Sequence, residues 1–459
     1  MYAGEREVVV RAALTVMLVL TVGVSGSLRA QQATPTLDPA VFDHYLGSYA
    51  FPSGRLLVIA RTERRLYAYE PGSERIRGLE PLDDRTWVAG PSLLVFEPET
   101  YRLSFRTDAQ GAVNSVEYSS GGTSEEATKA RLYREESVHF ANGDVTLAGT
   151  LLLPSTGGPH PAIVLGHGSG AQDRNGYVAN IRFIADHLAR HGIAVLTFDK
   201  RGSGRSTGDW STASFADLAD DLIAGVRLLR GRSDIVPSQV GIGGSSQVGW
   251  VAAKAVSKMP DIGFVVLTGA GGSGYTVEQQ NLYNTEVEMR AAGVSEARIA
   301  RALELQRQFF DVLRRGEGAP AREYDAAVTA ARQDTILGQW IFPLSMEIDW
   351  GKRNAWYTAL EVSFDPLPAW RSYRGPVLGL FGELDAQTPV AAVVPLFTEA
   401  LTSRKGTDFT ISVFPGASHL MMKATRASDD ELDKLTEMVP GYYDFVSDWI
   451  ASRLRNQVR

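Results

Sequence analysis

Apolar, strand-like runs alternate with helical stretches from about residue 161 onward, and this alternation restricts the possible folds more than any other feature of the sequence. The strand-like runs are PAIVLG (161–166), AVLTFD (194–199), QVGIGG (239–244), FVVLTGA (264–270), PVLGLFG (376–382) and DFTISVF (408–414). Helical stretches follow at about 177–190, at 214–231 and from 247, and an amphipathic helix ends the chain. Since continuously apolar strands must be covered on both faces, we predict a mostly parallel sheet between two layers of helices.

The region before this one has a different pattern. Between Phe42 and Glu117, short strands alternate with turn signals, and there is no helical period. The strand-like runs are RLLVIA (55–60), RLYAYE (65–70), TWVAG (86–90), SLLVFEP (92–98) and RLSFRT (102–107). This pattern predicts a small β-sandwich or barrel over residues 38–120, to which we assign no catalytic residue. The polar stretch Ser119 to Ala130 is predicted to be a linker, and the α/β domain to occupy 131–459.

The alternation stops between Gly274 and Arg374, where apolar residues recur at steps of three and four. We therefore predict a helical insertion at about 274–372. An insertion between two core strands is well placed to form a cap over the strand ends, and the alternative is that it only decorates the fold.

The N-terminus has the pattern of an export signal. Arg6 and Arg11 precede an apolar run of 13 residues, Ala12 to Val24, whereas a membrane-spanning helix needs roughly 20. We predict a signal peptide at 1–30, cleaved near Ala30, and a periplasmic or secreted protein without a stable membrane span after cleavage. An uncleaved anchor is the alternative.

Composition excludes several kinds of chemistry. The chain has no cysteine, so disulfides, thiolate catalysis and Cys-ligated zinc are excluded, and the absence of a free thiol suits an oxidising compartment. A net charge of −7 without a long basic stretch disfavours a nucleic-acid partner. No His or carboxylate cluster stands at ligand spacing, so we predict neither a metal ion nor an organic cofactor.

The stretch GIGGSSQVGW (241–250) places two serines where a strand turns into a helix. A nucleophilic serine at such a turn needs small neighbours, because the turn is strained and crowded against the strand. We prefer Ser246, since choosing Ser245 would put the long side chain of Gln247 in the second crowded position. Val248 departs from the G-x-S-x-G pattern.

A second strand end carries His167-Gly168-Ser169-Gly170. Acyl transfer needs two N–H donors aimed at the developing oxyanion. We assign them to the backbone amides of Ser169 and Gln247, the second of which directly follows the nucleophile.

A third group comes late in the chain, where Asp385 follows one strand and His419 follows the next. His419 would take the proton of Ser246 and pass it to the leaving group, and Asp385 would hold the ring and stabilise its charged form. Glu383 and Asp365 are the alternative acids. No functional role is assigned to His44, His139, His160, His187 and His191.

From about residue 137 to 459, the chain resembles exported or soluble α/β-hydrolase esterases with a helical cap. The matching pieces are GHGSGAQDRNG, FDKRGSGRSTGD (198–209), the serine turn, GELDAQTPV and GASH. In the second piece, Asp199 and Arg201 are expected to shape the loop. Tyr45 to Tyr49 (YLGSY) also resembles small β-domains appended to secreted serine hydrolases.

The resemblance implies an α/β-hydrolase fold and a serine carboxylesterase that cleaves small-molecule esters with short or medium acyl chains through an acyl-enzyme. Three alternatives stay open: a serine peptidase or aminopeptidase with the same triad, an acyl-thioesterase, and a catalytically inactive binding protein. The sequence does not indicate an oligomeric state.

Overall fold

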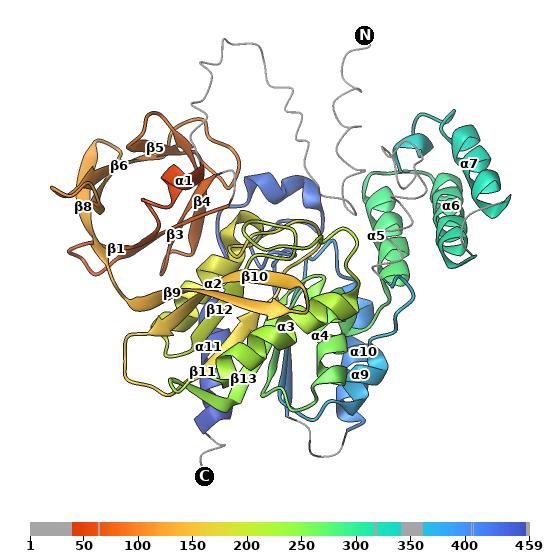
Figure 1. The fold of residues 1–459 in the computed structure, drawn as a ribbon. Helices are drawn as coiled ribbons and strands as arrows, with labels where there is room; N and C mark the ends of the chain where they lie inside the picture. The colour runs from red at the N-terminus through yellow and green to blue at the C-terminus, as the bar shows by residue number, and fades with distance from the viewer. Residues whose placement is uncertain are drawn as a thin grey trace, which may run out of the picture.

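The computed structural model describes residues 39–62, 65–315, 319–340, 361–404, 406 and 408–455. The predicted signal peptide lies outside these residues. A search of the described helices finds none that is long and apolar enough to cross a bilayer. Three parts follow one another along the chain: an N-terminal barrel, an α/β domain and a group of helices inserted into that domain (Figure 1).

The N-terminal part is a closed antiparallel barrel of eight strands. A short helix, α1 (Pro39–Phe42), precedes it. The strands are β1 (Gly47–Ala50), β2 (Leu56–Arg61), β3 (Leu66–Glu70), β4 (Arg75–Pro81), β5 (Thr86–Ala89), β6 (Tyr101–Thr107), β7 (Val113–Ser120) and β8 (Thr123–Ala130). Alternate residues point inward along the strands, and the barrel core is aromatic, with Tyr49, Trp87 and Phe105 buried together.

Two expectations for this part were wrong. The predicted linker is strand β8, which pairs with β7 and β1 and thereby closes the barrel and extends it beyond residue 120. The strand is polar because only Ala127 is buried, so the hydrogen-bond ladder rather than apolar content holds it. The segment 92–98 is not a strand, because its backbone bonds elsewhere: the Leu93 and Leu94 amides donate to Leu435 and Asp433.

The second part contains an eight-stranded sheet in the order β16-β15-β14-β13-β11-β12-β10-β9. Strands β11 to β16 run parallel, and β9 and β10 form an antiparallel hairpin at one edge. The strands are β9 (Tyr133–Asn142), β10 (Val145–Pro154), β11 (His160–Leu165), β12 (Ala194–Phe198), β13 (Ile235–Ser245), β14 (Val265–Thr268), β15 (Val377–Gly382) and β16 (Phe409–Phe414).

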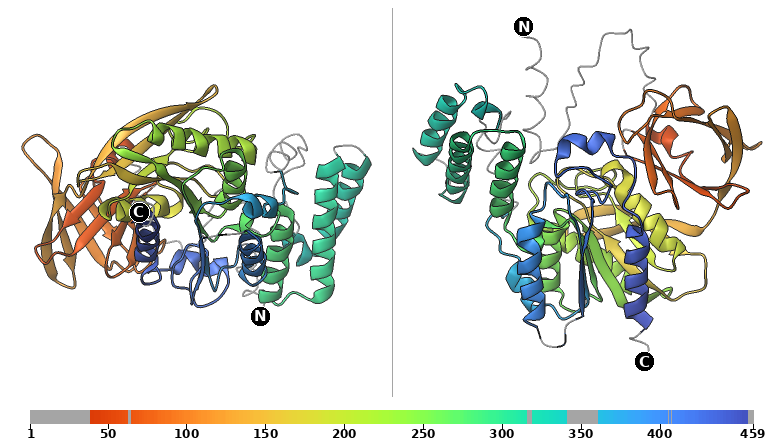
Figure 2. Two further views of the ribbon diagram at one scale, coloured as in Figure 1. Left: turned by 90° about the horizontal axis from the view of Figure 1, so that it is seen from below. Right: turned by 180° about the vertical axis from the view of Figure 1, so that it is seen from behind.

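Helices cover both faces of this sheet, as Figure 2 shows. One face packs against α3 (Phe215–Arg230), α4 (Val248–Lys258), α9 (Leu367–Ser372) and α10 (Val390–Thr402). The other packs against α2 (Asn180–Arg190) and α11 (Tyr442–Arg455). The predicted α/β class is therefore confirmed.

The inserted helices follow β14. A 3-10 turn, η3 (Gly271–Ser273), leads into α5 (Val277–Ala291), α6 (Glu296–Arg315), α7 (Ala319–Ala331) and η4 (Leu337–Gln339). Residues 341–360 of the predicted cap lie outside the described residues. Tyr283 of α5 lies near the strand ends: burial raises the pKa of its hydroxyl, and the charge of Asp385 adds to the rise.

The barrel and the sheet domain share a core and a row of backbone hydrogen bonds. The amide of Ile76 donates to Thr436 (2.9 Å), that of Leu93 to Leu435 (3.0 Å), and that of Met438 to Glu74 (2.8 Å). The segment 433–438, which contributes these bonds, begins in the last turn of η5 (Asp429–Lys434) and lies in the long loop before α11. The barrel thus pairs directly with the loop that begins near His419.

Candidate active site

Ser246 occupies the sharp turn between β13 and α4. Its φ is +58°, the left-handed region that a residue other than glycine seldom adopts without a special constraint. Its amide donates to the carbonyl of Thr268 on β14 (3.1 Å), which holds the turn. Ser245, in contrast, is the last residue of β13 and pairs with Thr268 in the sheet ladder. The strained position thus falls on Ser246, the serine that the sequence favoured.

His419 and Asp385 meet at the ends of β16 and β15. The Nδ1 atom of His419 lies 2.9 Å from Oδ2 and 3.0 Å from Oδ1 of Asp385, and both residues are buried. The backbone amides of Gln387 and Thr388 each donate to Asp385 Oδ1 at 2.8 Å. These bonds fix the carboxylate, and the carboxylate in turn holds the imidazole through its Nδ1 atom.

The contact with Asp385 changes the pKa of His419. Burial alone would lower the pKa of the imidazole, but the charge and the hydrogen bond of Asp385 outweigh it, so the pKa of His419 is raised above its usual range. The alternative acids lie elsewhere: Glu383 accepts the amide of Gly416, and Asp365 accepts the amide of Leu367. Of the three carboxylates, the structure brings Asp385 to the ring.

Gly269 connects the serine turn with the His–Asp pair. A Cβ built on this residue would lie 3.1 Å from Asp385 Oδ2 and 3.2 Å from His419 Nδ1. Gly269 follows Thr268, which accepts the Ser246 amide. Across the described residues no hydrogen bond joins the Ser246 hydroxyl to His419, and such bonds in ligand-free sites often form only with substrate. The three residues therefore gather at neighbouring strand ends.

The two predicted oxyanion donors lie beside Ser246. Gln247 is the N-cap residue of α4, where a backbone N–H has no partner within the helix. A Cβ on Gly168 would lie 3.7 Å from the Cβ of Ser246, so the loop after β11 that carries Ser169 reaches the serine. Both segments that carry the predicted donors therefore border Ser246.

A model of the alpha/beta hydrolase family matches residues 163–430, more than half of the chain. The chain belongs to the alpha/beta hydrolase family. This hydrolase is also similar to esterase EstD of Thermotoga maritima, with 29% identity over 102 residues. That match covers 21% of the present chain and spans only 25% of the length of EstD.

Two solved structures are similar to this one in part. Est1E of Butyrivibrio proteoclasticus, solved with bound ferulic acid, has 14% identity and a TM-score of 0.41, covering 70% of this chain and 99% of Est1E. The esterase Pf2001 of Pyrococcus furiosus has 16% identity and a TM-score of 0.42, covering 70% and 91% of the two chains.

Val248, the departure from the family's G-x-S-x-G pattern, is accommodated by two glycines. A Cβ on Gly244 would lie 2.7 Å from Val248 Cγ2, and a Cβ on Gly166 would lie 3.1 Å from the same atom. The valine side chain, 1% exposed, fills the space that both glycines leave. The hydrolase turn therefore keeps its geometry with a branched residue at this position.

We expect Gly244→Ala to destabilise the protein by about 2–5 kcal/mol, because a methyl group would overpack the turn and φ is +150° there. Thermal denaturation of the purified variant measures this. Gly157→Ala is the matched control, since no atom lies within 4 Å of its added methyl. Equal melting temperatures for the two variants would contradict the packing argument.

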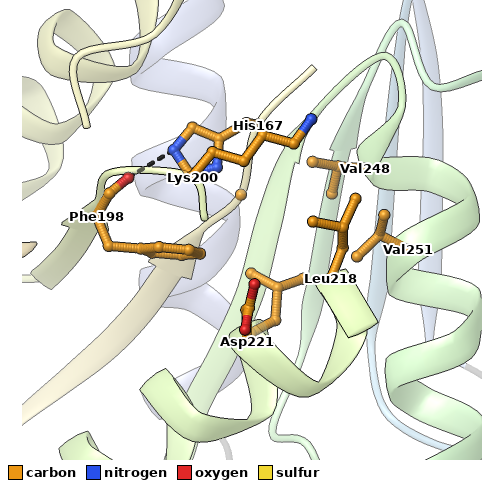
Figure 3. Close-up of a pocket in the computed structure, with 9 residues that line it drawn as sticks. His167, Phe198, Lys200, Leu218, Asp221, Val248 and Val251 are labelled. Carbon is orange, nitrogen blue, oxygen red and sulfur yellow. Dashed lines mark hydrogen bonds between the residues drawn. The ribbon is translucent and has the colours of Figure 1, made fainter. Parts of the chain in front are cut away.

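Sequence reasoning missed a buried lysine behind the serine turn. Lys200 lies beyond the end of β12, beside His167, and Figure 3 shows both with Phe198, Asp221 and Val248 around a small cavity. The His167 Nε2 atom lies 2.6 Å from the carbonyl of Phe198. Burial, with the nearby Lys200 charge, lowers the pKa of His167 to about 3, so this imidazole is neutral. The available signal was a lysine two residues after the end of an apolar strand.

The rest of the FDKRGSGRSTGD piece is structural, as expected. Asp199 accepts Arg174 Nη2 at 2.6 Å and the amide of Arg205 at 2.9 Å. Arg201 forms two hydrogen bonds to Asp221 of α3, at 2.7 and 2.8 Å. These ion pairs fix the loop next to the candidate oxyanion donors.

One group of potential metal ligands occurs among the described residues, at a place where the sequence predicted none. Potential ligand atoms of His187, His191 and Asp444 lie within 4.8 Å of one another between α2 and α11. His187 Nε2 already lies 3.2 Å from the Ser447 hydroxyl, and His191 Nδ1 lies 2.7 Å from the His187 carbonyl. The group takes no part in the serine site.

Proposed function

We propose that this protein is a serine hydrolase that cleaves carboxylic esters with short or medium acyl chains through an acyl-enzyme. One observation carries the proposal: a serine held at φ +58° lies at the strand end next to a buried His419–Asp385 pair. A reactive serine needs an exposed, constrained position and a base oriented by a third group. Family membership and the local similarity to EstD, an esterase, support the reaction class.

In the proposed first half-reaction, the Ser246 hydroxyl attacks the ester carbonyl while His419 Nε2 takes its proton. The carbonyl oxygen becomes an oxyanion, which accepts hydrogen bonds from the amides of Ser169 and Gln247. Asp385 stabilises the imidazolium that forms. The tetrahedral intermediate then collapses, the C–O bond to the alcohol breaks, and His419 gives the proton to the departing alcohol.

In the second half-reaction, water attacks the acyl-enzyme and His419 takes a proton from it. The new tetrahedral intermediate expels the Ser246 oxygen, which regains its proton from His419. The products are the acid and the alcohol, and the serine returns to its starting state. This cycle uses only the side chains and amides already described.

Hydrolysis of p-nitrophenyl butyrate and p-nitrophenyl acetate by the purified protein tests the reaction class. We expect turnover of both, weaker turnover of butyryl-CoA and much weaker turnover of an aminoacyl p-nitroanilide. The heat-denatured protein gives the background rate. Cleavage of the anilide alone would replace the esterase proposal with the peptidase, preferential cleavage of the thioester would favour the thioesterase, and no turnover of any of them would favour the binding protein.

A further inference from the structure

Lys200 is a buried ammonium that bonds to neutral oxygens. The residue is 3% exposed. Its Nζ atom donates to the carbonyls of Gly168 and Gly170, both at 3.0 Å, and to Gln247 Oε1 at 2.8 Å. Three bonds use all three donors of the ammonium. A buried charge is costly, so three acceptors converging on it form a built arrangement rather than an accidental one.

The nearby carboxylates are already engaged. Asp199 pairs with Arg174 at 2.6 Å, and Asp221 pairs with Arg201 at 2.7 Å. In the part of the chain that the structure describes, Lys200 itself forms no ion pair, so its charge acts on the peptide groups that it touches.

The contact with Gly168 determines the direction of a predicted oxyanion donor. The Gly168 carbonyl and the Ser169 N–H belong to one planar trans peptide, and in such a peptide the two bonds point in opposite directions. When Lys200 draws the Gly168 oxygen to one side, the Ser169 N–H must face the other side. The contact with Gly170 holds the next turn of the loop in the same way.

The third contact extends the arrangement to the serine turn. Gln247 carries the second predicted donor on its backbone, and its side-chain oxygen accepts from Lys200. One ammonium therefore bonds to both segments that carry the donors. An ammonium that donates a hydrogen bond to a carbonyl oxygen also polarises that peptide group. The N–H of the peptide then becomes a stronger donor, and the effect is larger where water is excluded.

We propose that Lys200 is a positioning residue that aligns the Ser169 amide with the Gln247 amide and strengthens the oxyanion site; this inference rests on the proposed hydrolase function. Lys200 acts through the two amides and does not touch the substrate. Its effect is then on the transition state, where the oxyanion exists, and not on substrate binding.

Because the proposed role depends on the charge of Lys200, it predicts how activity changes with pH. Burial lowers the pKa of Lys200 to about 7, and the charge of Asp221 opposes this shift. The ionisable groups that face Lys200 are His167, whose lowered pKa keeps the imidazole neutral, and two carboxylates in ion pairs, Asp199 with Arg174 and Asp221 with Arg201. As pH rises from 7 to 9, wild-type Lys200 loses its charge, whereas an arginine there keeps it.

The test compares Lys200→Met and Lys200→Arg with Lys258→Met, a surface control whose lysine pairs with Asp220. For p-nitrophenyl butyrate we expect Lys200→Met to lower kcat by about 10²- to 10³-fold, the effect of losing one oxyanion donor, with KM within threefold of wild type. Lys200→Arg should keep more activity than Lys200→Met and a higher ratio of kcat at pH 9 to kcat at pH 7 than wild type. Lys258→Met should match wild type.

Folding and function are separated by two further measurements. Melting temperature and labelling of Ser246 by a fluorophosphonate report whether each variant is folded and whether the serine is reactive. If Lys200→Met does not fold, the pH ratio of Lys200→Arg against wild type decides. A folded Lys200→Met with wild-type kcat, or a loss confined to KM, would overturn the role of Lys200 and leave the esterase proposal intact. If the proposed esterase function is itself wrong, the wild-type protein should show neither ester turnover nor fluorophosphonate labelling.

Discussion

Ser246→Ala is expected to lower kcat for p-nitrophenyl butyrate by about 10⁴- to 10⁶-fold, because the variant has no oxygen to form the acyl-enzyme. The residue keeps its backbone position, since alanine is no larger than serine and meets the same φ of +58°. Residual activity above the uncatalysed rate should remain, because the amides of Ser169 and Gln247 are still present. Steady-state kinetics with purified variants measures the effect.

Ser245→Ala is the matched control, as it makes the same change one residue earlier, in the ladder of β13. It should keep kcat within about threefold of wild type and should still be labelled by a fluorophosphonate. Labelling should be absent in Ser246→Ala. If Ser245→Ala loses labelling and Ser246→Ala keeps it, the assignment of the nucleophile is wrong.

Asp385→Asn is expected to lower kcat by about 10⁴-fold. The asparagine fits the same space, but its amide presents a donor where Asp385 accepts from His419 Nδ1, so the ring loses its orientation and its tautomer. The charge and the hydrogen bond of Asp385 also raise the pKa of His419 against the opposite effect of burial. His419 must be neutral to act as a base, so activity rises with pH through this pKa.

Removing that charge should lower the pKa of His419 and move the rising part of the pH–kcat curve to lower pH. A pH series of kcat from pH 5 to 9 for wild type and Asp385→Asn measures the shift. Glu383→Gln is the control, because Glu383 accepts the Gly416 amide and not the ring. A larger loss in Glu383→Gln than in Asp385→Asn would contradict the choice of acid.

The fold of the sheet domain could be predicted because its signals are local. Buried parallel strands are apolar along their whole length, and each of the six predicted runs overlaps a strand of the sheet. The barrel was harder. Strand β8 has one buried residue, so its sequence has the pattern of a linker. The strand is stabilised by pairing with β1, which lies far from it in the sequence.

In the candidate site, too, some residues could be predicted from local sequence signals and others could not. Ser246, Asp385 and His419 stand at predictable places, directly after strands, where small residues and turn signals mark them. The compensation for Val248 was not predictable, because it depends on Gly166, some 80 positions earlier in the chain, lying against the valine. Lys200 was missed for the same reason, as its partners Gly168 and Gln247 come from two other strand ends.

The pairing of the barrel with residues 433–438 has a consequence for how the protein is divided into parts. His419 begins a loop whose far end is bonded to the barrel rather than to the sheet, through the carbonyls of Leu435 and Thr436. A shortened version starting at the first strand of the sheet would retain every proposed reacting group. It would nevertheless remove the backbone bonds that the barrel makes to residues 433–438, so we expect the barrel to be needed to hold this loop in place.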